Sequence, residues 1–206
     1  MIQLYYITLV LASILLTCAT VFGFLKYKLF TEKEKSYIYY IIFLFCIELT
    51  SNALLLKIKS NDFLYPVYIA GEFFMVSSIF FKKLSLSKYY YTASASLSLF
   101  FLVGDRILAR YHYNIDYSKA TSNIIITCII GYSLIRDIKK IENKSSFQII
   151  DKMMFLYFTV SIFIFMFQHE LLAFPVEYFS GFWIINNLMV SSLYSLFIYT
   201  FLKLKK

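Results

Sequence analysis

Six polar side chains lie within otherwise apolar runs of this sequence, at depths where a polar ligand or an ion could bind. They are two carboxylates, three amides and a tyrosine: Glu48, Asn52, Tyr68, Glu72, Asn186 and Asn187. A spacing of one helical turn puts Glu48 with Asn52 on one face, and Tyr68 with Glu72 on another. Because ionisable and amide groups are costly in hydrocarbon, such residues mark either contacts between helices or a functional site.

Two carboxylates on neighbouring apolar segments favour a pocket for a proton, a cation or a small polar ligand. The polar side chains gather in one half of their segments, so we expect the pocket to open to the outside. Its mouth is predicted to hold Arg106, Arg110, His169 and Glu170. The alternative is that these groups only hydrogen-bond across helices and hold a bundle together, with one carboxyl kept protonated by burial.

The chain offers little for catalysis or metal binding. Only two histidines are present, and Cys18, Cys46 and Cys128 fall inside apolar runs without metal-ligand spacing. Glycine-rich nucleotide-binding motifs and the Gly-x-Ser-x-Gly motif of serine hydrolases are absent. We therefore expect no cofactor, no metal and no catalytic residue, which favours a non-enzymatic role.

Composition predicts that the segments carrying these residues are membrane spans. Of 206 residues, 60% are hydrophobic and only 16% are charged, which is far from the makeup of a soluble domain. Long apolar runs without period-two alternation are expected to form helices in a bilayer, where backbone groups find no water. The predicted fold is an all-α integral membrane bundle of about seven helices in one domain, at 4–25, 37–56, 63–81, 89–104, 119–135, 153–169 and 179–202.

The distribution of basic residues predicts the orientation of this bundle. With the N-terminus outside and the C-terminus in the cytoplasm, fifteen of the twenty Lys and Arg residues fall in cytoplasmic segments, as the positive-inside rule requires. The external ones are Lys57, Lys59, Arg106, Arg110 and Lys119. The runs 89–104 and 119–135 are the weakest spans, so six spans with one buried or re-entrant segment is the alternative.

The net charge of +8 is expected to serve the membrane surface rather than nucleic acid. Basic residues punctuate the spans, where they meet anionic lipid headgroups. The loop from Arg136 to Lys152 and the tail from Lys203 to Lys206 offer a surface for a cytoplasmic protein partner, and a homo-oligomer is compatible with the pattern. No loop is long enough to form a separate nucleic-acid-binding domain, so we expect no direct nucleic-acid binding.

Two short blocks carry a resemblance to a known family. The block NDFLYPVYIAGEF (61–73) contains Tyr68 and Glu72, and the block FWIINN (182–187) contains Asn187. Together they resemble an uncharacterised family of small multi-span membrane proteins of Bacteroidetes-type bacteria. The resemblance covers under a quarter of the chain and implies a multi-pass protein of a bacterial inner membrane. It points to Glu72 and Asn187 without assigning them a role.

The function favoured by these features is a non-enzymatic multi-pass module that senses a ligand or acts as an accessory partner of another protein. One alternative is a small seven-helix transporter that uses Glu48 and Glu72 for proton or cation coupling. A second is an accessory membrane protein of a CRISPR-type defence system, on the ground of comparable size. A third is a membrane-embedded lipid-modifying enzyme, which would also need a carboxylate pair.

Overall fold

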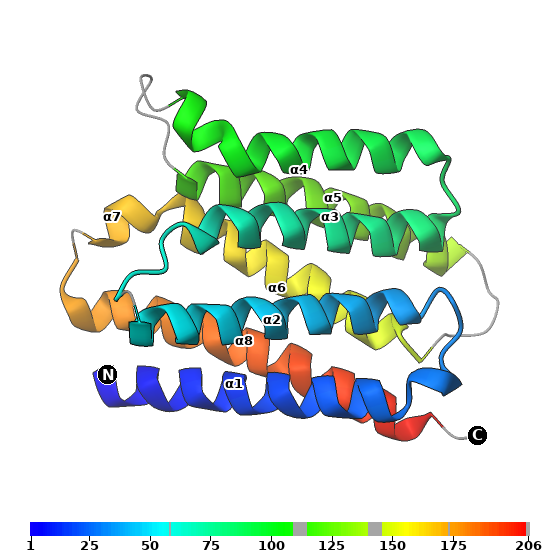
Figure 1. Ribbon diagram of the computed structural model, residues 1–206, viewed down its shortest axis with the longest axis horizontal. Coiled ribbons are helices and arrows are strands. Elements are labelled where there is room, and N and C mark those ends of the chain that lie inside the picture. The colour runs from blue at the N-terminus through cyan, green and yellow to red at the C-terminus, as the bar shows by residue number, and fades with distance from the viewer. Residues whose placement is uncertain (58, 109–114, 140–145, 173, 205–206) are drawn as a thin grey trace.

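The computed structural model describes residues 1–57, 59–108, 115–139, 146–172 and 174–204. Long helices run side by side in it, and consecutive long helices are antiparallel (Figure 1). Met1 lies at one end of the bundle and Lys203 at the other, and the two ends are named after these residues below. The helices are α1 (Ile2–Leu25), η1 (Tyr27–Leu29, a 3₁₀ turn), α2 (Lys35–Lys57), α3 (Leu64–Leu84), α4 (Lys88–Leu108), α5 (Ile115–Lys139), α6 (Gln148–Met166), the short α7 (Gln168–Leu172) and α8 (Val176–Lys203).

Six of these helices are long and apolar enough to cross a membrane, namely α1, α2, α3, α5, α6 and α8. The outer surface is apolar, and Ile7 and Val10 of α1, for example, are more than half exposed. Three charged side chains lie inside, since Glu72, Lys119 and Asp151 are at most 1% exposed. A soluble protein has the opposite arrangement. The all-helical architecture predicted from the sequence is therefore confirmed, and it is the architecture of a multi-pass membrane protein.

The helix α4 has 21 residues, as many as α3, but is not among the six helices that are apolar enough to cross a membrane. Its lower hydropathy comes in part from serines on the inner face, where Ser94 and Ser98 are buried. The outer face carries Leu99, Val103 and Ile107, which are exposed. Small residues let membrane helices approach closely, so the serines of α4 suit its packing against α3.

The contacts between helices follow a closed order. The helix α1 packs on α2, α2 on α3, α3 on α5, α5 on α6, α6 on α8, and α8 on α1 again. The helix α4 lies outside this ring, at the edge of the bundle beside α3 (Figure 1). At the Lys203 end the interior is filled by aromatic rings, with centroids 5.1 Å apart for Phe30 and Phe201 and 4.9 Å apart for Tyr37 and Phe147.

Local sequence explains several helix ends. Before α2, the backbone N–H of Thr31 donates to Glu34 Oε2 at 2.9 Å, and the N–H of Glu34 donates to Thr31 Oγ1 at 3.4 Å, which is a capping box. Pro66 stands in the first turn of α3 and Pro175 precedes α8, where a helix needs no N–H from proline. Ser85 ends α3 in the left-handed region, with a φ of 55°.

Candidate functional site

A buried ion pair between α3 and α5 is the centre of the polar interior. Lys119 Nζ contacts Glu72 Oε2, and the two residues are 0% and 1% exposed. Glu72 Oε1 also accepts hydrogen bonds from the hydroxyls of Tyr68, at 2.9 Å, and Tyr40, at 3.2 Å. Such additional bonds matter because the attraction between two buried charges scarcely offsets their loss of hydration. The Glu72 carboxylate is therefore fully engaged within the protein.

Helix geometry explains how these groups meet. Tyr68 and Glu72 are one turn apart on α3, and Glu72 lies about 12 Å along the helix from its first residue, at 1.5 Å per residue. Lys119 stands near the start of α5, and its long side chain places Nζ 3.2 Å from the Tyr68 hydroxyl and 4.3 Å from the centroid of the Tyr68 ring. The Phe165 ring of α6 lies 5.7 Å from the same atom. One carboxylate and two aromatic rings thus hold the ammonium group.

The network extends from the ion pair into α6. Asn123 follows Lys119 by one turn, and its Nδ2 donates to Ser161 Oγ at 3.1 Å. Tyr157, also on α6, hydrogen-bonds both Ser161 and Tyr68. Polar side chains of three helices, α3, α5 and α6, are therefore linked in one buried network.

A cavity of about 300 Å³ lies beside this network, near the middle of the bundle. Five helices line it, α1, α2, α3, α6 and α8, and its wall is mixed apolar and polar. Its polar lining residues are Tyr40, Glu48, Ser51, Tyr68, Glu72, Tyr157, Asn186 and Tyr194. A concave space with a few converging polar groups is the usual form of a small-molecule site, so this is the candidate functional site.

Two polar groups of the cavity wall, one half-buried and one buried, have an incomplete set of partners. Glu48 accepts a hydrogen bond from Ser13 Oγ, but within the described residues no lysine or arginine forms an ion pair with it. Asn186 is only 9% exposed, and its Oδ1 has no hydrogen-bond partner among the described residues. The cavity therefore contains an uncompensated carboxylate and an unused carbonyl oxygen.

Four of the six candidate binding residues line this one cavity, namely Glu48, Tyr68, Glu72 and Asn186. The structure does not place the other two there. Asn187 faces α1, where its Nδ2 donates to Thr8 Oγ1 at 3.3 Å. Asn52 lines a separate hollow between α1 and α2, which Glu48 also borders.

Of the four residues predicted at the mouth of the pocket, only Glu170 has a described side chain. Glu170 lines a different, apolar groove. Only the backbone is described for Arg106 and His169, and Arg110 lies outside the described residues. Glu170 lies on the separate short helix α7, which the chain forms after Met166 instead of continuing α6 to His169, and the predicted mouth stays a prediction.

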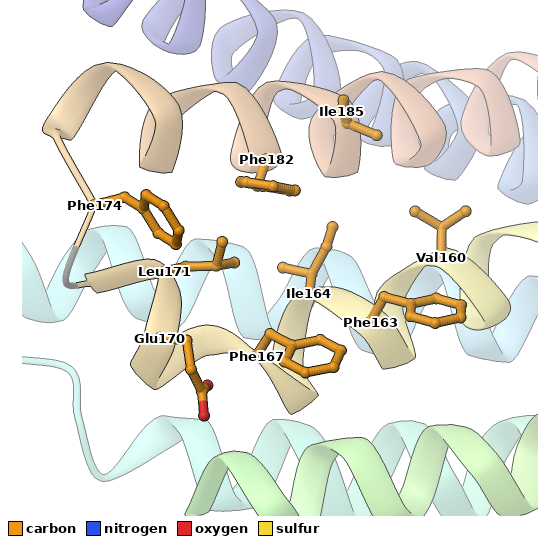
Figure 2. Close-up of a pocket in the computed structure, with 9 residues that line it drawn as sticks. All are labelled: Val160, Phe163, Ile164, Phe167, Glu170, Leu171, Phe174, Phe182 and Ile185. Atoms are coloured by element: carbon orange, nitrogen blue, oxygen red, sulfur yellow. The ribbon is translucent and has the colours of Figure 1, made fainter.

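The apolar groove lies between α6, α7 and α8, near the Met1 end, and has a volume of about 560 Å³ (Figure 2). Phe163 of α6, Phe167 between α6 and α7, and Phe182 of α8 stand along it, and Glu170 lies at its edge. It contains no converging set of polar groups. Its lining is suited to hydrocarbon, so it is not the site for a polar ligand.

Lys119 is the functional residue that sequence reasoning missed. It was expected at the external start of the span 119–135, and it was counted among the external basic residues. In the structure, α5 begins at Ile115 and Lys119 is fully buried. The polar residues of this stretch belong to the helix because their side chains face its neighbours: Ser118, Lys119, Ser122 and Asn123 are at most 1% exposed. Their helical spacing, 118–119 followed by 122–123, was the signal available in the sequence.

A second polar network lies at the Lys203 end, where the sequence had suggested an apolar interior. Lys83 contacts Asp137 and lies 2.6 Å from Asp151 Oδ2, while the Tyr37 hydroxyl donates to Asp151 Oδ1 at 2.5 Å. Asp151 is fully buried because α6 begins at Gln148, five residues before the predicted span. The expected confinement of polar groups to one half of the bundle is therefore wrong, and this network ties α2, α3, α5 and α6 together.

Comparisons with known proteins identify no relative, since no protein family, curated protein or solved structure matches this chain. Within the described residues, no group of three or more His, Cys, Asp or Glu side chains could hold a metal ion. The cavity and its surroundings are therefore the features that indicate a function.

Proposed function

We propose that the chain is a non-enzymatic, multi-pass membrane protein whose central cavity binds a small polar ligand, in the role of a sensor or an accessory module. The observation that carries this proposal is a cavity whose wall holds a carboxylate without a cationic partner among the described residues, Glu48, and an amide oxygen without a donor, Asn186 Oδ1. A fully satisfied ion pair lies beside it. Unpaired polar groups at membrane depth are costly and typically functional. A ligand would supply the missing partners.

We further propose seven crossings, including α4. The helices α3 and α5 both run from the Met1 end to the Lys203 end, so the chain between them must return across the bundle, and α4 makes that return (Figure 1). Its 21 residues span about 31 Å, at 1.5 Å per residue, which is the thickness of a hydrocarbon core. Its exposed face is apolar, as contact with lipid requires.

The proposed orientation has the Lys203 end in the cytoplasm and the Met1 end outside a bacterial inner membrane. Among the surface residues that the structure describes, the Met1 end holds only Lys57 and Lys59 as basic side chains, whereas the other end is densely basic, which supports this orientation. The basic side chains there are Lys26, Lys28, Lys33, Lys35, Lys82, Lys83, Lys88, Arg136, Lys139, Lys152 and Lys203. We propose that this surface meets anionic headgroups and a cytoplasmic partner protein.

A ligand-binding function is favoured over a transporter that couples protons or cations through two free carboxylates. Glu72 is already compensated by Lys119 and by two tyrosine hydroxyls. A transporter of the kind considered above would need both Glu48 and Glu72 to exchange protons or ions. The geometry leaves only Glu48 free for that role.

Hydration of the cavity is the first property to test. In purified protein with Cys18, Cys46 and Cys128 replaced by alanine, Ser51→Cys puts a thiol on the cavity wall. Ser77→Cys is the matched control, since Ser77 is 1% exposed and lies outside the cavity lining. We expect a small water-soluble thiol reagent to modify Ser51→Cys much faster than Ser77→Cys. Equally slow reaction at both positions would contradict a water-accessible binding cavity.

A further inference from the structure

The charge balance of the cavity indicates which class of ligand it would accept. Lys119, the cation of the adjoining buried network, does not line the cavity and is already bound to Glu72. Glu48 has no cationic partner among the described residues, and Asn186 Oδ1 has no donor. Both groups are hydrogen-bond acceptors: Glu48 lacks a positive charge beside its carboxylate, and Asn186 Oδ1 lacks a donor.

Aromatic rings on the cavity wall point to the same class. Tyr40, Tyr68, Tyr157 and Tyr194 all line the space, and tyrosine rings attract cations through their faces. The protein already uses this chemistry, since the Lys119 ammonium lies 4.3 Å from the Tyr68 ring centroid. A second ammonium group in the cavity would meet a similar combination of carboxylate and ring.

We propose that the cavity binds a small organic ammonium ion, with Glu48 as its counter-ion, Asn186 Oδ1 as an acceptor and tyrosine rings around the positive centre. This inference rests on the proposed function and adds the ligand class to it. The volume of about 300 Å³ is at the small end for ligand pockets and far exceeds that of a dehydrated metal ion. A bare metal ion would also require several oxygen ligands at about 2.0–2.6 Å, and only one uncompensated carboxylate is present.

Comparing choline with its neutral isostere 3,3-dimethylbutan-1-ol distinguishes the contribution of ligand charge to binding from that of ligand shape. The full chain in maltoside micelles is titrated with each compound while the melting temperature and the binding isotherm are measured. We expect choline to raise the melting temperature, because a ligand that binds only the folded state stabilises it. The isostere should produce no shift, since it has the same outline without the charge.

Glu48→Gln tests the proposed counter-ion. The amide keeps the size of the side chain and can still accept a hydrogen bond from Ser13, so the fold should persist. We expect choline to bind about tenfold more weakly or worse, because a charge-assisted contact is replaced by a neutral one. Glu177→Gln is the matched control, since Glu177 is exposed and lies outside this cavity lining, and it should leave choline affinity unchanged.

Failure of the ligand class and failure of the binding cavity are distinguishable. If Ser51→Cys is modified rapidly but choline does not bind, or binds no better than the isostere, the organic cation is wrong and the hydrated cavity stands. Unchanged choline affinity in Glu48→Gln would likewise overturn the assignment. If Ser51→Cys is as unreactive as Ser77→Cys, the proposed function itself is wrong.

Discussion

At Lys119 the fold holds an ammonium group away from water, near the start of a membrane helix. The charge is compensated by Glu72, and the ring and hydroxyl of Tyr68 complete its surroundings. Removing one member of a buried pair leaves the other charge without a partner, whereas removing both avoids that cost. Glu72 thus stabilises the bundle, which makes it a poor position for testing ligand binding.

The ion pair can be tested by a double-mutant cycle. We expect Glu72→Gln and Lys119→Met each to lower the free energy of unfolding by about 3–5 kcal/mol, because each leaves a buried charge unpaired. The double variant should be markedly more stable than the sum of the two losses predicts. The measurement is thermal or denaturant unfolding of the purified protein in detergent.

Glu170→Gln provides the control for this cycle, since Glu170 is exposed and forms no ion pair within the described residues. Its unfolding should match that of the unsubstituted protein. Additive losses in the double variant would show that Lys119 and Glu72 do not interact.

Individual site residues were predictable where a polar side chain interrupts a long apolar run. Glu48, Tyr68, Glu72 and Asn186 stand out for that reason, and they share a cavity. Hydropathy does not tell in which direction a side chain points. Lys119 was therefore missed near a helix start, where lysines usually face water, and Asn187, which faces α1, could not be separated from its neighbour Asn186.

At the scale of the helices, the Phe43 ring of α2 packs directly on Gly71 of α3, beside the ion pair. A Cβ atom at Gly71 would clash with the Phe43 Cζ atom, so only glycine fits there unless the ring moves. Gly71 directly precedes Glu72, and Tyr40 of α2 donates to that carboxylate. The small residue thus allows the distance between the two helices that the site requires.

Gly71→Ala should separate these helices and destabilise the protein by about 1–3 kcal/mol, the usual cost of overpacking. The measurement is again unfolding in detergent, and adding Phe43→Leu should recover most of the loss. Gly104→Ala on α4 is the control, because its nearest neighbour would be 3.6 Å away. Equal effects of the two alanine substitutions would contradict the close approach of α2 and α3.

The existence of seven long helices was predictable because each must satisfy its own backbone hydrogen bonds in lipid. The first residues of α5 and α6 could not be predicted, because polar side chains near the start of each helix face the interior. The closed order of helix contacts and the position of α4 outside it depend on side-chain packing across the bundle. Apolar runs of similar composition do not encode those pairings.

For the molecule as a whole, the two ends of the bundle differ. The Lys203 end is filled by the rings around Phe30 and Phe201 and by the network of Asp151, while the cavity lies near the middle. Ser51, on the cavity wall, is about 9 Å from the end of α2 at 1.5 Å per residue. This arrangement favours access to the cavity from the Met1 end.

The central claim is a seven-crossing bundle whose cavity opens outward, and one labelling experiment in intact cells tests it most directly. Single cysteines are placed at Ser60 and Ser87, which are exposed at the Met1 and Lys203 ends respectively, and at Ser51 in the cavity. A membrane-impermeant thiol reagent is applied from outside, to protein lacking its native cysteines. We predict modification of Ser60→Cys and Ser51→Cys but not of Ser87→Cys until the cells are opened. Modification of Ser87→Cys in intact cells, or protection of Ser51→Cys alongside a reactive Ser60→Cys, would contradict the account.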